Sequence, residues 1–182
     1  MDFTISNGWL NPATHLPSPN FDSRPDGSAV DLLVIHNISL PPGDYGSGCV
    51  QQLFCNSLDC SKHPYFAKLV GLKVSSHLLI EREGNVTQFV SFDERAWHAG
   101  ESTHAGRSRC NDFSIGIELE GVDEEPYTDQ QYTALVAVTD TLLQSYAAIN
   151  NQRIVGHCDI APERKTDPGP AFDWQRYLSA LA

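Results

Sequence analysis

The apolar positions of this chain form two long runs that predict buried strands. Residues 31–38, DLLVIHNI, are almost continuously apolar and β-branched, which is typical of a strand inside a sheet. Residues 113–120, FSIGIELE, alternate instead, so the apolar side chains share one face and Glu118 and Glu120 share the other. These two runs predict the centre of a sheet.

Shorter patterns surround these two strands. We expect a β-hairpin, short helices in a loop-rich stretch, a long helix capped by Thr128, and a closing helix. The hairpin is expected at 77–82 and 86–91, and the short helices at 50–54 and 65–70. The long helix is expected at 128–149, a further strand at 154–158 and the closing helix at 173–181. Residues 1–30 are predicted to be an arm without regular structure and 96–111 a loop. The chain is predicted to be one α/β domain over residues 1–182.

Charge and cysteine usage narrow the class of partner. The chain has 23 acidic and 12 basic residues, a formal net charge of −11, which argues against nucleic-acid binding because that depends on cationic side chains. No apolar run is long enough to span a membrane, and the first residues lack the features of a signal peptide. Five cysteines without a CxxC pair favour free thiols. We therefore expect a cytoplasmic protein with a small, dissolved substrate and no membrane partner.

Two histidines at strand ends and one loop aspartate are candidate metal ligands. His36 interrupts the first apolar run, and His157 precedes a loop in which prolines flank Asp167. A single histidine in such a place is more often structural than a ligand. Two imidazoles and a carboxylate, however, are a ligand set of catalytic zinc, with a fourth position left for water. Cys158 is a rival ligand, but in a strand it would point away from His157.

Other polar residues have two interpretations at this stage. Glu118 and Glu120 either form a solvated strand face, or one of them is a general base. Lys165 is either a surface lysine or, two residues before Asp167, a cation that stabilises an oxyanion. Trp97 either stacks on a sugar or covers the core. The spacing of these residues indicates a mononuclear metal hydrolase and names no substrate.

Five sequence blocks together resemble a known family. They are VIHNISLPPG (34–43), SSHLLI (75–80), AWHAG (96–100), RCNDFSIGIELEG (109–121) and GHCDIAPERKTDPGP (156–170). They are similar to the zinc-dependent N-acetylmuramoyl-L-alanine amidases, and in particular to the cytoplasmic 1,6-anhydro-N-acetylmuramyl-L-alanine amidases of cell-wall recycling. The resemblance extends from Gly8 to about Trp174. It implies a mixed central sheet flanked by helices.

The resemblance also implies residue roles. Zinc is expected on His36, His157 and Asp167, with Glu118 as the general base and Lys165 as the oxyanion stabiliser. Contacts with the substrate are expected from Asn37 and Trp97 near the sugar and from Arg109 and Lys73 near the stem peptide. Lys73 stands where close relatives have arginine, so it keeps the charge but loses a bidentate pair with a carboxylate.

The implied activity is hydrolysis of the amide between the muramyl lactyl group and L-alanine, by a monomer acting on a small muropeptide. Two rivals remain. A muropeptide-binding module without activity would usually lack a zinc ligand, whereas all three candidates are present. A secreted or phage wall lysin is disfavoured by the free thiols and the negative charge. A purely structural role leaves the polar residues at the strand ends unexplained.

Overall fold

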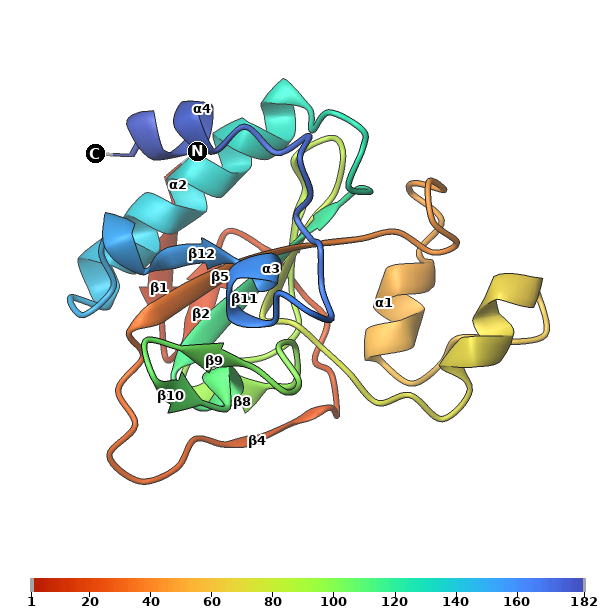
Figure 1. The fold of residues 1–182 in the computed structure, drawn as a ribbon, viewed down its shortest axis with the longest axis horizontal. Coiled ribbons are helices and arrows are strands. Elements are labelled where there is room, and N and C mark those ends of the chain that lie inside the picture. Colours follow the sequence, from red (N-terminus) through yellow and green to blue (C-terminus); the bar gives the residue numbers. More distant parts are fainter. Residues whose placement is uncertain (1, 182) are drawn as a thin grey trace.

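A mixed sheet of six strands forms the centre of the computed structural model, which describes residues 2–181 (Figure 1). The strand order is β12–β5–β11–β6–β7–β3; β12, β5, β11 and β6 are parallel, and β7 runs antiparallel to β6. The bounds are β3 (Thr14–His15), β5 (Leu32–Ile38), β6 (Leu78–Ile80), β7 (Val86–Gln88), β11 (Ser114–Glu120) and β12 (Ile154–Gly156). This mixed sheet in a single domain confirms the predicted fold class.

Helices α2 (Asp129–Ser145) and α4 (Trp174–Ser179) cover one face of the sheet (Figure 1). The odd-numbered apolar residues of β5 and β11, such as Ile35 and Ile117, share one apolar cluster with Leu135 of α2. The predicted cap is present, because the backbone N–H of Gln131 donates to Thr128 Oγ1 at 3.1 Å and the Gln131 side chain accepts in return. Among the described residues, no helix combines the length and apolar character that crossing a bilayer requires.

The other face of the sheet carries the polar residues. There α3 (His157–Ile160) and the segment from residue 97 to 113 pack against Leu32 and Val34. A separate apolar cluster joins α1 (Cys49–Phe54) and the 3-10 helix η1 (Pro64–Leu69) to Leu79 and Phe89; Figure 1 shows these two helices set off to the right of the sheet. Both short helices and the β6–β7 hairpin agree with the predictions.

Two predicted irregular segments contain strands. Residues 1–30 hold β1 (Thr4–Ser6), β2 (Trp9–Asn11), β3 and β4 (Phe21–Ser23), so the prediction of an arm without regular structure is wrong. Strands β1 and β2 form a hairpin whose turn, Asn7–Gly8, has positive φ angles of 51° and 75°. The predicted loop 96–111 contains β9 (Thr103–His104) and β10 (Arg107–Ser108), and β4 pairs with β8 (Glu94–Ala96).

Candidate active site

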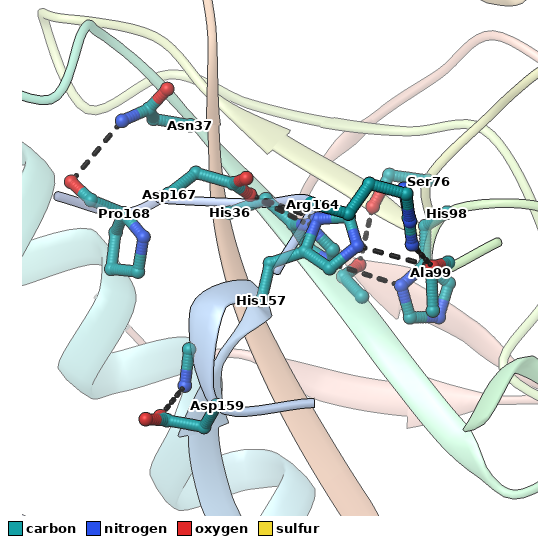
Figure 2. Close-up of polar contacts among 12 residues, drawn as sticks. His36, Asn37, Ser76, His98, Ala99, His157, Asp159, Arg164, Asp167 and Pro168 are labelled. Atoms are coloured by element: carbon teal, nitrogen blue, oxygen red, sulfur yellow. Dashed lines mark hydrogen bonds and ion pairs between the residues drawn. The ribbon is translucent and has the colours of Figure 1, made fainter. Parts of the chain in front are cut away.

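Three predicted metal ligands lie together on the polar face of the sheet (Figure 2). His36 Nδ1 is 2.9 Å from His157 Nδ1 and 3.1 Å from Asp167 Oδ2, and His157 Nδ1 is 3.0 Å from the same oxygen. All three residues are buried. Figure 2 shows Asp167 approaching the histidines from the side opposite His98 and Ala99.

The sheet register explains why residues far apart in sequence meet here. Gly156, the last residue of β12, lies opposite Ile35 of β5, so the next residue, His157, emerges beside His36. His157 begins α3 and does not extend the strand, which corrects the prediction of a strand through Cys158. The turn is stabilised by Asp159 Oδ2, which accepts a hydrogen bond from Gly156 N at 2.7 Å.

Asp167 returns to the site from the loop that follows α3. The backbone N–H of Cys158 donates to the carbonyl oxygen of Asp167 at 3.0 Å. This bond holds the loop against the start of the helix. Cys158 lies in α3 and not in a strand, so the alternation of a strand does not determine where its thiol points, and that prediction is wrong. The cluster of possible ligands in the described residues nevertheless contains His36, His157 and Asp167 and not Cys158.

The protonation of His157 suits a metal ligand. His157 Nε2 lies 3.1 Å from the carbonyl oxygen of Ala99, which can only accept, so Nε2 carries the proton and Nδ1 a lone pair. Burial lowers the pKa of His36 to about 4, so the His36 ring is neutral at pH 7. Two imidazole nitrogens and a carboxylate oxygen that converge at about 3 Å could hold a metal ion between them and are compatible with zinc.

Glu118 lies next to this cluster because its β11 position is paired in register with His36 on β5. Its Oε2 atom is buried and has no hydrogen-bond partner in the described structure. Burial, followed by the nearby Asp167 carboxylate, raises the pKa of Glu118 well above its ordinary value, against the opposing effect of Lys165. A buried carboxyl group with a raised pKa next to possible metal ligands is typical of a general base.

Glu120 is also buried, so the interpretation of the two glutamates as a solvated face is wrong. All residues of β11 are buried because loops cover its second face. Unlike Glu118, Glu120 has partners for both oxygens. Its Oε1 accepts from Gly46 N at 2.6 Å and its Oε2 from Arg82 N at 3.2 Å. Glu120 therefore ties two loops together.

A cleft of about 620 Å³ opens over the cluster, within the usual size range for small-molecule sites. Lys165 and Asp167 both line it, as expected for residues two apart in an extended loop. One part of its wall is polar. The rest of the wall is largely apolar and includes Leu40, Leu53, Phe54, Tyr65, Leu69, Leu72, Val74 and Trp97.

The predicted substrate contacts divide into two groups. Asn37 and Trp97 line the cleft. The Asn37 amide donates to Asp123 Oδ1 at 2.8 Å and to the carbonyl oxygen of Pro168 at 3.1 Å. Of the described residues, those that line this cleft do not include Arg109 or Lys73.

Arg109 and Lys73 lie elsewhere. Arg109 Nε is 3.4 Å from Asp112 Oδ2, and its side chain is largely exposed. Lys73 borders a neighbouring hollow next to Leu72. The predicted contacts of these two cations with a stem peptide therefore need a substrate that extends beyond the cleft.

One residue at the site was not predicted. His98, in the block AWHAG, is buried, and its Nδ1 lies 2.9 Å from His36 Nε2. Its position depends on a contact between residues 62 apart in sequence, and no local periodicity marks it. The only available signal was its place directly after Trp97, which was already a candidate.

Comparisons with known proteins found related sequences and structures. The family model described as N-acetylmuramoyl-L-alanine amidase matches residues 26–170. The chain is 58% identical to the 1,6-anhydro-N-acetylmuramyl-L-alanine amidase AmpD of Enterobacter cloacae, over 97% of this chain and 94% of that protein. A crystal structure of a selenomethionine derivative of AmpD superposes with a TM-score of 0.95 at 54% identity, over 98% of this chain and 99% of that one.

A more distant structure contains a substrate. It is the complex of the N-acetylmuramyl-L-alanine amidase AmiD from Escherichia coli with anhydro-N-acetylmuramic acid-L-Ala-D-γ-Glu-L-Lys. It has a TM-score of 0.62 and 28% identity to this chain, and the match covers 98% of this chain and 65% of that one. The family match over most of the chain, together with the relatives above, establishes that this protein belongs to the N-acetylmuramoyl-L-alanine amidase family.

Proposed function

We propose that this protein hydrolyses the amide bond between the lactyl group of (1,6-anhydro-)N-acetylmuramyl sugars and L-alanine, in the recycling of peptidoglycan. The observation that carries the proposal is a buried His36–His157–Asp167 cluster beside an unpartnered Glu118, at the base of a cleft. A relative named for this activity matches nearly the full length of the chain.

In this proposal zinc is the cofactor and His36, His157 and Asp167 are its ligands. The three donors supply neutral imidazole nitrogens and one carboxylate oxygen, which zinc accepts in catalytic sites with one position left open. Zinc bound there would lower the pKa of a water molecule and polarise the substrate carbonyl. The protein contributes the fixed positions of the ligands and the dry surroundings.

Glu118 is the proton carrier of the reaction. Its raised pKa, its free Oε2 and its position beside His36 allow it to take the proton of the attacking water. As the tetrahedral intermediate collapses, Glu118 gives this proton to the departing amine of L-alanine. One residue therefore serves as base and then as acid.

Lys165 stabilises the negative charge that develops on the carbonyl oxygen. Its ammonium group lines the same cleft as Asp167, and a fixed cation near the forming oxyanion lowers the barrier. Asn37 and Trp97, also in the cleft, would contact the sugar. Arg109 and Lys73 would contact carboxylates of the stem peptide farther out. We expect the enzyme to act as a monomer on dissolved muropeptide in the cytoplasm, consistent with its unpaired cysteines.

The test is cleavage of a purified anhydromuropeptide, with the products identified by mass spectrometry. We expect the anhydro-sugar and a free stem peptide beginning with L-alanine. A chelator should abolish the reaction and added zinc should restore it. Tight muropeptide binding without cleavage would instead favour the recognition module, and cleavage at a different bond would contradict the assigned reaction.

A further inference from the structure

The two candidate histidine ligands contact two consecutive residues, His36 the ring of His98 and His157 the backbone carbonyl of Ala99. His36 Nε2 lies 2.9 Å from His98 Nδ1, and His157 Nε2 lies 3.1 Å from the carbonyl oxygen of Ala99. These contacts are on the side of each ring away from Asp167 (Figure 2). Ring nitrogens that face away from a metal determine which nitrogen of a ligand carries the proton.

The hydrogen-bond donors can be assigned by starting from the far end of the chain of contacts. The carbonyl oxygen of Cys110 can only accept, so Ser114 Oγ, 2.6 Å away, donates its single hydrogen to it. Ser114 Oγ must then accept from His98 Nε2, which lies 3.1 Å away. The proton of His98 is therefore on Nε2.

The same assignment continues to His36. His98 is buried, and the hydrogen-bond partners of its ring nitrogens are His36 and Ser114, neither of which is a carboxylate, so a second proton on its ring is disfavoured. His98 Nδ1 consequently accepts from Nε2–H of His36. The lone pair of His36 is then on Nδ1, which faces His157 Nδ1 and Asp167 Oδ2.

Two further features hold residues 98 and 99 in place. Asn111 Oδ1 accepts from the backbone N–H groups of both residues, at 3.2 and 2.8 Å. The strand beneath His98 has glycine at position 116, where an added Cβ would lie 2.5 Å from Cγ and Nδ1 of the His98 ring. The ring can occupy this place only because Gly116 has no side chain.

We propose that His98 and the Ala99 carbonyl form a positioning element that sets the tautomers of both histidine ligands and aims their lone pairs at one point. Ser114 and Asn111 hold this element in place, and it acts on the two ligand histidines. The inference rests on the proposed function only in taking the cation at that point to be zinc.

The first test measures tautomers directly. Long-range ¹H–¹⁵N spectra of the metal-free protein should show protons on Nε2, and not on Nδ1, for His36, His98 and His157. A proton on Nδ1 of His36 or His157 would overturn the proposal. This result does not depend on metal binding or activity, so it stands even if the protein binds no zinc and the proposed function fails.

The second test measures zinc affinity by competition with a chelator. His98→Leu should weaken zinc binding about 10–100-fold, the usual effect of losing an outer partner of a ligand histidine. His98→Asn should restore affinity to within about threefold of wild type, because its amide oxygen takes the place of Nδ1 as acceptor. Equal losses in both variants, with unchanged folding, would reduce His98 to a packing role and overturn the proposal.

A matched pair of serine variants covers the case in which His98→Leu fails to fold. Ser114 and Ser76 are both fully buried, and each donates a hydrogen bond to a backbone carbonyl, of Cys110 and Gly116 respectively. Of these two serines, Ser114 is the one whose hydroxyl is within hydrogen-bond distance of His98. Ser114→Ala should weaken zinc binding and allow the second tautomer of His98, whereas Ser76→Ala should leave both unchanged. An equal effect of the two variants would contradict the proposed path.

Discussion

Replacing Glu118 and Glu120 by glutamine, one at a time, separates a chemical role from a structural role at neighbouring positions on one face of β11. Both side chains are buried, but only Glu120 has partners for both oxygens. Glu118 has an unpartnered Oε2 beside the ligand cluster. The two substitutions should therefore change different measured quantities.

For Glu118→Gln we expect kcat to fall by about 10²–10⁴-fold, the usual contribution of a general base. Zinc content should stay the same, because Glu118 is not one of the three ligands. The free energy of unfolding should not decrease, because a neutral amide costs less to bury than a carboxylate. The assay is release of the stem peptide together with urea denaturation of the same preparation.

For Glu120→Gln the structure predicts a loss of stability. The amide has one accepting oxygen, so one of the two backbone N–H groups now bound, from Gly46 or Arg82, faces an NH₂ group. Losing a hydrogen bond to a buried charged group costs about 1.5–3 kcal/mol. For a chain of 182 residues a loss near 2 kcal/mol lowers Tm by about 4–8 °C. Activity per folded molecule should remain near wild type.

The reverse pattern of results would contradict these roles of Glu118 and Glu120. A zinc-loaded Glu118→Gln variant with nearly wild-type kcat would remove Glu118 as the base. A Glu120→Gln variant that keeps its melting temperature but loses activity would show that Glu120, and not Glu118, is the base.

Three further perturbations follow from the same contacts. Lys165→Met should lower kcat about 10²–10³-fold with zinc retained, and an unchanged kcat in steady-state assays would remove Lys165 from oxyanion stabilisation. Gly169→Ala should lower both Tm and zinc affinity, because Gly169 has φ +80° and an added Cβ would lie 2.3 Å from Asp123 Cα; Gly106→Ala, at φ +78° with open space around it, is the control that should affect Tm alone. In metal-free protein, burial lowers the pKa of His36 to about 4 and that of His77 to about 3, from 6.5, so the unfolded chain binds more protons below about pH 6.5 and stability should fall from there toward pH 4. Burial raises the pKa of Glu118, which stabilises the folded protein as the pH falls. The loss of stability between pH 6.5 and 4 should therefore be steeper in Glu118→Gln. A urea midpoint that stays constant from pH 7 to 4 in that variant would contradict the lowered pKa values of the two histidines.

The long elements of the fold could be predicted because each is long enough for its spacing of apolar residues to repeat. Strands β5 and β11 have seven residues each and α2 has 17, enough for the apolar period to identify the element. Helix α2 also carries its own start signal, Thr128 with Gln131. Burial of the second face of β11 was not predictable, because the segments that cover it come from distant parts of the chain.

The short strands at the start of the chain were not predicted, because they are too short to show a pattern. Strands β1 and β2 have three residues each, too few to show alternation. Their turn, Asn7–Gly8, nevertheless adopts the positive φ angles that make Asn-Gly the strongest local hairpin signal, so this hairpin could have been predicted. The end of β12 at Gly156 could not, because it depends on the capping contact with Asp159 and on the Asp167 loop.

At the site, the sequence indicated residue types and the family resemblance indicated roles. Tertiary contacts supplied what neither could. His98 contacts His36 across a separation of 62 residues. Glu118 has an oxygen without a partner, whereas loops supply partners for both oxygens of Glu120. Local sequence patterns describe neither contact. Positioning residues of this kind become visible only when the strands are in register.

In the proposed function, His36, His157 and Asp167 hold one zinc ion for amide hydrolysis. Anomalous diffraction at the zinc absorption edge, on crystals of the zinc-loaded protein, would locate that ion. We predict a single peak at about 2.0–2.2 Å from Nδ1 of both histidines and from the Asp167 carboxylate, lost in His157→Ala. A peak on other residues, bonding through Nε2, or no peak in catalytically active crystals would contradict this assignment of the ligands.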